Sequence, residues 1–286
     1  MPGQLLDGKI LAQKIRGELK KEVIELKNKT GRVPRLINVM IGQDDGSCAY
    51  ANSQKKTAEY MGIQYELLAL PWDVKQELLS EAIKKLNQDP QVNGIMIHKP
   101  VPASINYREV ANHVDMVKDL EGINVANIGK MILGETKMIP CTPAAVMAHL
   151  QSTGVNFRGK EAVIVGHSEI VGKPLSLLLL EKYATVTVCH IATTEAGKLA
   201  DHVRRADIVV VAVGKPALIK GEWIKKGAVV IDVGINREGE RIVGDVEFDA
   251  AKKRASFITP VPGGVGPVTV VMLMRNGIEA FKAQRK

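Results

Sequence analysis

A tyrosine and a glutamine four positions apart form the first pair of residues whose types and spacing could do chemistry. Tyr50 and Gln54 belong to the stretch SCAYANSQKKTAEYMG, residues 47–62, and a four-residue spacing puts two side chains on one face of a helix. A tyrosine ring can stack on a flat ligand ring, and an amide both donates and accepts hydrogen bonds. Because an amide does not titrate, Gln54 offers such a site no proton transfer at neutral pH.

Glycines end several apolar runs in the second half of the chain. In VIVGHSEIVGKP, Gly166 follows a predicted strand and Gly172 opens a predicted helix, where backbone N–H groups can meet a pyrophosphate. Gly214 and Gly234 end two later runs. Each glycine alone is explained by a tight turn, and the usual three-glycine spacing of a dinucleotide site is absent. Four such turns at consecutive strand ends nevertheless favour a bound cofactor.

Alternating helices and strands must position the tyrosine and glutamine. The spacing of apolar residues predicts helices and strands in turn over residues 9–30, 35–42, 47–61, 64–70, 74–88 and 93–98. Gly62 closes the helix that carries Tyr50. Strands that alternate with helices of this length are typical of a parallel sheet with crossover helices.

A second alternation follows a connecting helix that begins near Pro143 and stops at Gly154. Four apolar strands within residues 160–234, with helices expected at 171–183 and 195–204, predict a doubly wound, Rossmann-like sheet. The fold class is therefore α/β with two domains. We expect a first domain over residues 1–139, onto which a C-terminal helix at 268–286 packs, and a dinucleotide-binding domain over residues 140–267.

Composition limits the classes of partner. The net charge of +8 suits anionic ligands, yet the basic residues are scattered along amphipathic helices and aromatic residues are only 4% of the chain, which argues against nucleic acid. No run approaches the ~20 apolar residues of a membrane helix, and the start of the chain lacks a signal-peptide pattern. Three widely spaced cysteines suggest neither a disulfide framework nor a metal site. We expect a cytoplasmic protein without a membrane partner.

Six motifs together resemble the bifunctional methylenetetrahydrofolate dehydrogenase/cyclohydrolase family. They are PCTP (140–143), GHSEIVGKP (166–174), AVGKP (212–216), VIDVGIN (230–236), VGDV (243–246) and TPVPGGVGPVT (259–269). The resemblance implies a catalytic domain, a nicotinamide-binding domain, a folate cleft between them and a homodimer. It also implies two reactions of one-carbon metabolism: hydride passes from methylenetetrahydrofolate to nicotinamide, and water then adds to the methenyl cation.

The residues that carry chemistry in this family depart from its pattern. Tyr50 is retained, but Gln54 stands where the family has its catalytic lysine. The family's Gln-Leu-Pro is His98, Lys99 and Pro100, and its pterin-holding aspartate is Glu121. By resemblance, the catalytic set is Tyr50, Gln54, His98 and Glu121, and the substrate-binding set adds Lys99, Pro100, Pro262, Gly263 and Gly264.

These substitutions affect the two reactions unequally. Hydride transfer needs orientation of two rings rather than a protein base, whereas hydrolysis gains about 100-fold to 10,000-fold from a general base. We therefore expect a dehydrogenase whose cyclohydrolase activity is weak or absent. Two alternatives stay open: a bifunctional enzyme in which His98 replaces the lysine as base, and a non-catalytic paralogue that binds folate or nucleotide.

The resemblance also assigns the cofactor site. Its residues are Gly166, His167, Ser168, Ile170, Val171, Gly172, His190, Ile191, Val213, Gly214, Lys215 and Ile235. NADP-dependent members of the family often read the extra phosphate at the positions of His167 and Ile191. Isoleucine provides no hydrogen-bond donor for the phosphate of NADP. No Asp or Glu ends the preceding strand to bind the free ribose hydroxyls of NAD. We expect NADP or NAD as cofactor, with a slight preference for NAD.

Overall fold

The chain folds into two compact units in a computed structural model that describes residues 2–42 and 44–285. The three-stranded unit comprises Lys14–Cys141 and the chain from Val270 onward, and the six-stranded unit comprises the chain up to Gln13 and Thr142–Thr269. The boundaries at 141/142 and 269/270 each lie two residues from the expected ones at 139/140 and 267/268. The first residues of the chain were expected in the first domain, but the chain up to Gln13 belongs to the six-stranded unit.

The three-stranded unit is built on a parallel sheet with the order β3-β2-β4. The strands are β2 (Arg35–Ile41), β3 (Gln64–Leu70) and β4 (Gly94–Ile97). The helices of this unit are α2 (Asp45–Met61), α3 (Gln76–Gln88), α4 (Tyr107–His113) and α5 (Val125–Ile132), and the unit boundaries fall inside α1 (Gly8–Thr30) and α11 (Val265–Ala283).

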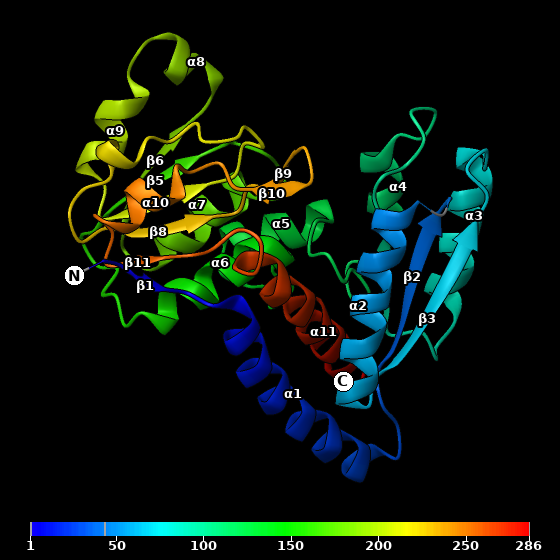
Figure 1. Ribbon diagram of the computed structural model, residues 1–286. Coiled ribbons are helices and arrows are strands. Elements are labelled where there is room, and N and C mark those ends of the chain that lie inside the picture. Colours follow the sequence, from blue (N-terminus) through cyan, green and yellow to red (C-terminus); the bar gives the residue numbers. More distant parts are fainter. Residues whose placement is uncertain (1, 43, 286) are drawn as a thin grey trace. The chain divides into compact units, whose positions relative to one another are not determined.

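Strand β2, which runs beside β3 in Figure 1, directs its alternate side chains to two different layers. Ile37 and Val39 join the apolar core formed with α3 and α4. Leu36 and Asn38 point the other way, where Leu36 packs on Gly277 of α11 and Asn38 contacts Gln54 of α2. The C-terminal helix therefore packs on the first sheet, as the sequence predicts.

Helix α2 has a defined start and end. The Asp44 carboxylate accepts a hydrogen bond from the Ser47 N–H at 3.0 Å, which satisfies a free backbone donor of the first turn. Gly62 ends the helix in the left-handed region at φ 76°, where glycine is favoured. These two signals fix the helical register that carries Tyr50 and Gln54.

The six-stranded unit is a parallel sheet with the order β1-β11-β8-β7-β5-β6. Its strands are β1 (Gln4–Leu5), β5 (Glu161–Val165), β6 (Thr185–Cys189), β7 (Ile208–Val211), β8 (Val229–Asp232) and β11 (Phe257–Ile258). Its helices are α6 (Cys141–Ser152), α7 (Gly172–Glu181), α8 (Ile191–Glu195), α9 (Leu199–Arg205), α10 (Phe248–Lys252) and the short 3-10 helix η1 (Gly221–Trp223). A hairpin of β9 (Asn236–Glu238) and β10 (Arg241–Val243) is antiparallel.

The sheet confirms the predicted doubly wound class. Its central strands β5, β7 and β8 are buried along almost their whole length, which explains why they read as continuous apolar runs. The helix expected at 195–204 is instead the pair α8 and α9, because Gly197 at φ 68° interrupts it. In the described part of the chain, no helix is long and apolar enough to span a membrane.

Candidate active site

Tyr50 and His98 meet at the carboxyl end of the three-stranded sheet. Tyr50 comes from α2 and His98 directly follows β4, and their ring centroids lie 5.7 Å apart in an edge-to-face arrangement. Tyr50 stays 37% exposed, which leaves part of its ring free to contact a ligand. His98 is buried, and this burial lowers the pKa of its imidazole, an effect that the charge of Asp44 opposes. Burial therefore favours the neutral form of this ring.

Gln54 is fully buried within a polar cluster that the sequence did not predict. Its Oε1 accepts hydrogen bonds from the Tyr65 hydroxyl at 2.6 Å and from Asn38 Nδ2 at 3.0 Å. Asn38 Nδ2 also lies 3.3 Å from His98 Nδ1. A single polar residue inside the apolar run RLINVMIG was the available signal for Asn38. The cluster holds the Gln54 amide inside the protein, and it contains no group that is charged at neutral pH.

Glu121 forms a second polar group in the same unit, together with Tyr107 and Lys99. The Tyr107 hydroxyl donates to Glu121 Oε2 at 2.9 Å, and Lys99 Nζ lies 3.8 Å from the centroid of the Tyr107 ring. Burial raises the pKa of Glu121 to about 7, an effect to which the charge of Asp119 adds and which the Tyr107 hydrogen bond and Lys99 oppose. Glu121 is therefore a carboxyl group that changes its charge near neutral pH.

The turn that presents Glu121 is fixed by Asp119. This buried carboxylate accepts hydrogen bonds from the N–H groups of Glu121, Gly122 and Asn124 at 3.2, 3.0 and 2.8 Å. Gly122 adopts φ 68°, and a Cβ atom there would lie 2.6 Å from the Ile139 carbonyl carbon, so a side chain is excluded. The Lys99–Pro100 peptide bond, beside the same site, is cis.

Glycine is required at both ends of the turn that follows β5. A Cβ atom at Gly166 would lie 2.3 Å from the Ala212 carbonyl oxygen, and one at Gly172 would lie 2.0 Å from the Gly166 carbonyl oxygen. Ser168 Oγ accepts the Val171 N–H at 3.2 Å inside this turn. The first turn of α7 and its backbone N–H groups thus lie directly at the strand end, which is the geometry of a pyrophosphate site.

Four expected cofactor residues are large aliphatic side chains left open to solvent. Each lies just beyond the carboxyl end of a parallel strand, and they are Ile170, Ile191, Val213 and Ile235, which are 43, 66, 38 and 71% exposed. Exposed aliphatic side chains at consecutive strand ends favour a ligand that covers them. His167 and His190 lie at the same edge, and their ring centroids are 5.3 Å apart.

Asp245 holds the turn after β7 and was not predicted as a site residue. Its buried carboxylate accepts hydrogen bonds from the N–H groups of Val213, Gly214 and Lys215 at 2.8, 3.0 and 2.8 Å, and from Asn236 Nδ2 at 2.8 Å. Asp232 in turn accepts the Asp245 N–H at 3.0 Å. Asp245 of the motif VGDV thus supplies the carboxylate that fixes the backbone of three predicted cofactor residues, Val213, Gly214 and Lys215.

The loop with Pro262, Gly263 and Gly264 belongs to the six-stranded unit. Gly263 adopts φ 101°, and a Cβ atom at Gly264 would lie 2.5 Å from the Pro260 carbonyl oxygen. The fully buried His149 places Nε2 3.3 Å from the Gly264 carbonyl oxygen. Both glycines are therefore needed for the path of this loop.

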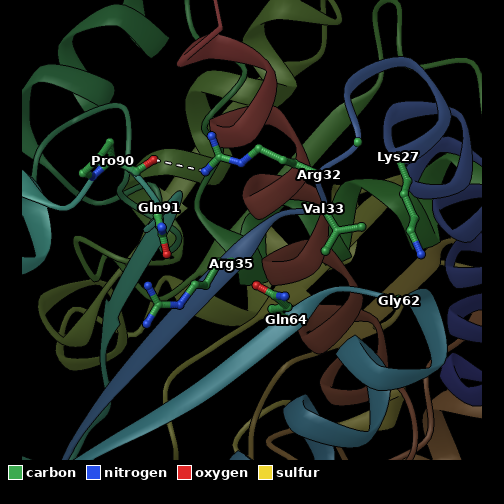
Figure 2. A pocket seen from close by; sticks show the side chains of 9 residues that line it. Lys27, Arg32, Val33, Arg35, Gly62, Gln64, Pro90 and Gln91 are labelled. Carbon is green, nitrogen blue, oxygen red and sulfur yellow. Dashed lines mark hydrogen bonds between the residues drawn. The ribbon is translucent and has the colours of Figure 1, made fainter.

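A groove of about 810 Å³ lies at the amino end of the three-stranded sheet, and Figure 2 shows the side chains that line it. It is lined by residues at the amino ends of β2 and β3, among them Arg35 and Gln64, and by the exposed Lys27 and Arg32. Arg35 already bonds Glu66 at 2.7 Å and Asp89 at 3.2 Å. Because ligands of parallel sheets bind at carboxyl ends, and no predicted site residue lines the groove, we assign it no role in the site.

A doubly wound parallel sheet with glycine turns at its carboxyl edge is the architecture of the dinucleotide-binding class of domains, and nicotinamide-dependent dehydrogenases combine such a domain with a second unit. The chain matches the family models of the tetrahydrofolate dehydrogenase/cyclohydrolase catalytic domain over residues 6–121 and of its NAD(P)-binding domain over residues 140–285. The chain therefore belongs to the tetrahydrofolate dehydrogenase/cyclohydrolase family.

Relatives share the whole length of the chain. The bifunctional protein FolD of Moorella thermoacetica is 46% identical over 283 residues, which are 99% of this chain and 100% of that one. The FolD of Acetivibrio thermocellus is 48% identical over 287 residues, covering 100% and 99%.

Solved structures of two further enzymes agree in fold. The dehydrogenase/cyclohydrolase of Campylobacter jejuni superposes with a TM-score of 0.94 at 40% identity, covering 98% of this chain and 99% of that one. That of Trypanosoma brucei, solved with NADP cofactor and inhibitor, gives 0.94 at 39%, covering 99% and 98%.

Proposed function

We propose that this protein oxidises 5,10-methylenetetrahydrofolate to the methenyl compound with a nicotinamide cofactor and hydrolyses that product only slowly. The residue that carries the proposal is Gln54. By resemblance it stands where the family has its catalytic lysine, it does not titrate, and its amide oxygen already accepts hydrogen bonds from Asn38 and Tyr65. Hydride transfer does not need this residue, because the substrate carbon is activated by its own nitrogens.

The remaining residues support binding of both ligands. In the proposal the exposed part of Tyr50 stacks on the folate, and the Glu121 carboxylate accepts N–H groups of the pterin. The exposed aliphatic residues of the six-stranded unit pack on the cofactor, whose pyrophosphate meets the start of α7. The chain's own residues thus orient two rings and supply no strong base.

Purified protein tests the proposal through two separate rates. One assay follows reduction of the cofactor with methylenetetrahydrofolate, and the other follows loss of added methenyltetrahydrofolate above the buffer rate. We expect oxidation to exceed hydrolysis by about 100-fold or more, the contribution of a missing general base. Hydrolysis as fast as oxidation would refute the proposal.

A second candidate is full bifunctionality with Glu121 as the base. It is favoured by the pKa of Glu121, which is about 7, the value at which a general base works best at neutral pH. The relatives from Moorella and Acetivibrio are both named bifunctional. The unchanged enzyme would then hydrolyse methenyl substrate rapidly, and Glu121→Gln would abolish this hydrolysis.

The pH dependence of folate binding follows from the carboxyl group of Glu121. Because the folded state raises the pKa of Glu121 from 4.5 to about 7, the carboxylate that accepts pterin N–H groups is present above pH 7 and is lost below it. Its contribution to folding has the opposite sense, since it is present below pH 4.5 and is lost as the pH rises through 7. We expect the KM for folate in the oxidation to fall about 10-fold between pH 6 and pH 8.

Glu121→Gln is the matched variant for this prediction, because it keeps the size of the side chain and removes its titration. The KM of this variant should be flat over the same range. If the KM of the unchanged enzyme does not vary with pH, the Glu121 carboxylate is not the group that binds the pterin.

The preference for NAD or NADP is predicted from the residues that follow β5 and β6 at the carboxyl end of the six-stranded sheet. By resemblance, His167 and Ile191 stand where NADP-dependent members read the extra phosphate, and Ile191 has no polar group to donate. We expect initial rates with NAD to equal or exceed those with NADP at equal concentration, and Ile191→Arg to shift the ratio toward NADP by about 10-fold. A strong NADP preference in the unchanged enzyme would contradict this prediction. A homodimer and a cytoplasmic location remain predictions from resemblance and composition.

A further inference from the structure

Tyr107 was not predicted as a site residue, yet it contacts two charged side chains of the candidate site with two different parts of its own side chain. Its hydroxyl donates to Glu121 Oε2 at 2.9 Å. Its ring lies beneath the ammonium of Lys99, whose Nζ is 3.8 Å from the ring centroid. One half-buried residue thus places a carboxylate and a cation relative to each other.

The start of α4 holds Tyr107 in place. Tyr107 is the first residue of this helix, and Asn106 caps the helix by accepting the Glu109 N–H at 3.3 Å. The Asn106 N–H donates to Gln76 Oε1 of α3 at 2.7 Å. Helix α4 also packs into the apolar core of the three-stranded unit through Val110. The aromatic ring therefore extends from a helix end that is fixed on both sides.

The direction of the hydrogen bond between Tyr107 and Glu121 follows from their chemistry. Burial, together with the charge of Glu121, raises the pKa of the Tyr107 hydroxyl far above its ordinary value. The hydroxyl therefore keeps its proton near neutral pH and donates it to the carboxylate. A hydrogen bond donated to the charged form lowers the pKa of a carboxyl group, so Tyr107 opposes the burial that raises the pKa of Glu121.

The other charged and titratable neighbours of Glu121 come from the surrounding elements. Lys99, which follows β4, also opposes the effect of burial on the pKa of Glu121, whereas Asp119 of the same turn adds to it. The Tyr50 hydroxyl of α2 and the Cys141 thiol at the start of α6 have pKa values raised by burial and further by the charge of Glu121, so both stay protonated near neutral pH. Tyr107 and Lys99 are therefore the neighbouring side chains that favour a charged Glu121.

Lys99 keeps its N–H donors available for a ligand. Its side chain is exposed, and in the part of the chain that the structure describes no carboxylate forms an ion pair with its Nζ. An aromatic face attracts a cation, so the ammonium has a preferred place beside Glu121 without a direct salt bridge to it. By resemblance the family has leucine at this position, which has no donor. The cation is therefore a property of this chain.

We propose that Tyr107 is a positioning residue which holds Glu121 and Lys99 so that the two recognise adjacent atoms on one edge of a pterin ring. That edge presents a ring N–H and an amino group beside a carbonyl oxygen. Glu121 accepts from the N–H groups, and Lys99 donates to the carbonyl oxygen. The recognition of the pterin rests on the proposed function, whereas the link between Tyr107 and the charge of Glu121 does not.

The charge of Glu121 is measured in the protein without ligand. Carbon-13 labelling of the glutamate carboxyl groups reports their titration, and Glu121→Gln identifies the signal of Glu121. We expect the midpoint at about pH 7 in the unchanged protein and at higher pH in Tyr107→Phe, which keeps the ring and removes the hydroxyl. An unchanged midpoint in Tyr107→Phe would overturn the role of the hydroxyl, whether or not the protein binds folate.

The role of the ring is measured by the binding of tetrahydrofolate to the protein alone at pH 8. We expect Lys99→Met to raise the Kd about 10-fold, the usual value of a charge-assisted hydrogen bond. Added to Tyr107→Phe, whose ring still holds the ammonium, it should again raise the Kd about 10-fold, but added to Tyr107→Leu it should raise the Kd less than about 3-fold. Equal losses in the two backgrounds would show that the ring does not position Lys99.

Lys20→Met is the matched control, because Lys20 also lies over a tyrosine ring. Its Nζ is 4.3 Å from the centroid of the Tyr60 ring, and Tyr60 lies roughly 15 Å beyond Tyr50 along α2. This variant should leave the Kd for tetrahydrofolate unchanged. If Lys99→Met also leaves it unchanged while the protein binds tetrahydrofolate, the inference fails and the proposed function stands. A protein that binds no tetrahydrofolate would overturn the proposed function and the recognition of the pterin together.

Discussion

Replacing Gln54 with lysine is expected to raise the hydrolysis of methenyltetrahydrofolate about 100-fold or more, which is the usual contribution of a general base. The site suits such a base because position 54 is fully enclosed, and burial lowers the pKa of a lysine toward neutrality. Oxidation should change much less, because orientation of the rings does not depend on this side chain.

Gln54→Met provides the matched control for that experiment. It removes the same amide and has a similar length, but it cannot titrate, so hydrolysis should stay at the level of the unchanged enzyme. Rates are measured with added methenyltetrahydrofolate and with each variant shown to be folded by its oxidation activity. A Gln54→Lys enzyme that oxidises normally without faster hydrolysis would contradict the assignment of position 54.

Replacing Asp245 with asparagine is expected to cause the second large effect, on the nicotinamide cofactor. The carboxylate accepts four N–H groups from the turn at Val213–Lys215 and from Asn236. An amide accepts through one atom only and places its own NH₂ group against these donors, which leaves buried groups unpaired at about 1–3 kcal/mol each. We expect the KM for the cofactor to rise at least about 10-fold and the thermal midpoint to fall.

Asp249→Asn is the control, since Asp249 is an exposed carboxylate in α10 outside this network. It should change neither quantity appreciably. Titrations at saturating folate separate an effect on the cofactor from an effect on the folate site. An Asp245→Asn enzyme with an unchanged KM for cofactor would show that the turn keeps its shape without the carboxylate.

Much of the architecture could be predicted from the sequence, because its strands are either long apolar runs or bounded by strong turn signals. The strand at Gln64–Leu70 and the helix that ends at Gly62 lie where the sequence predicts them. Strands β1 and β11 contain two residues each, too few for any periodicity to be read. The assignment of the first residues to the wrong unit follows from this, since Gln4 and Leu5 pair with Phe257 and Ile258.

The candidate site could be predicted only in part. Family resemblance predicts Tyr50, Gln54, His98 and Glu121 as site residues, but it could not show that Gln54 is enclosed by Asn38 and Tyr65. That contact depends on the register between β2 and β3, in which Asn38 is opposite Leu67 and Tyr65 lies two residues away on the same face. Register of this kind depends on tertiary packing and leaves no local signal.

Simultaneous observation of both products in a single turnover tests the central claim most directly. Enzyme in excess is mixed with methylenetetrahydrofolate and cofactor, and the absorbances of reduced cofactor and of methenyltetrahydrofolate are followed together. If Gln54 leaves the site without a base, both signals rise in step and the methenyl signal then decays near its rate in buffer. If the methenyl signal never accumulates while formyl product appears as fast as the cofactor is reduced, the account is wrong.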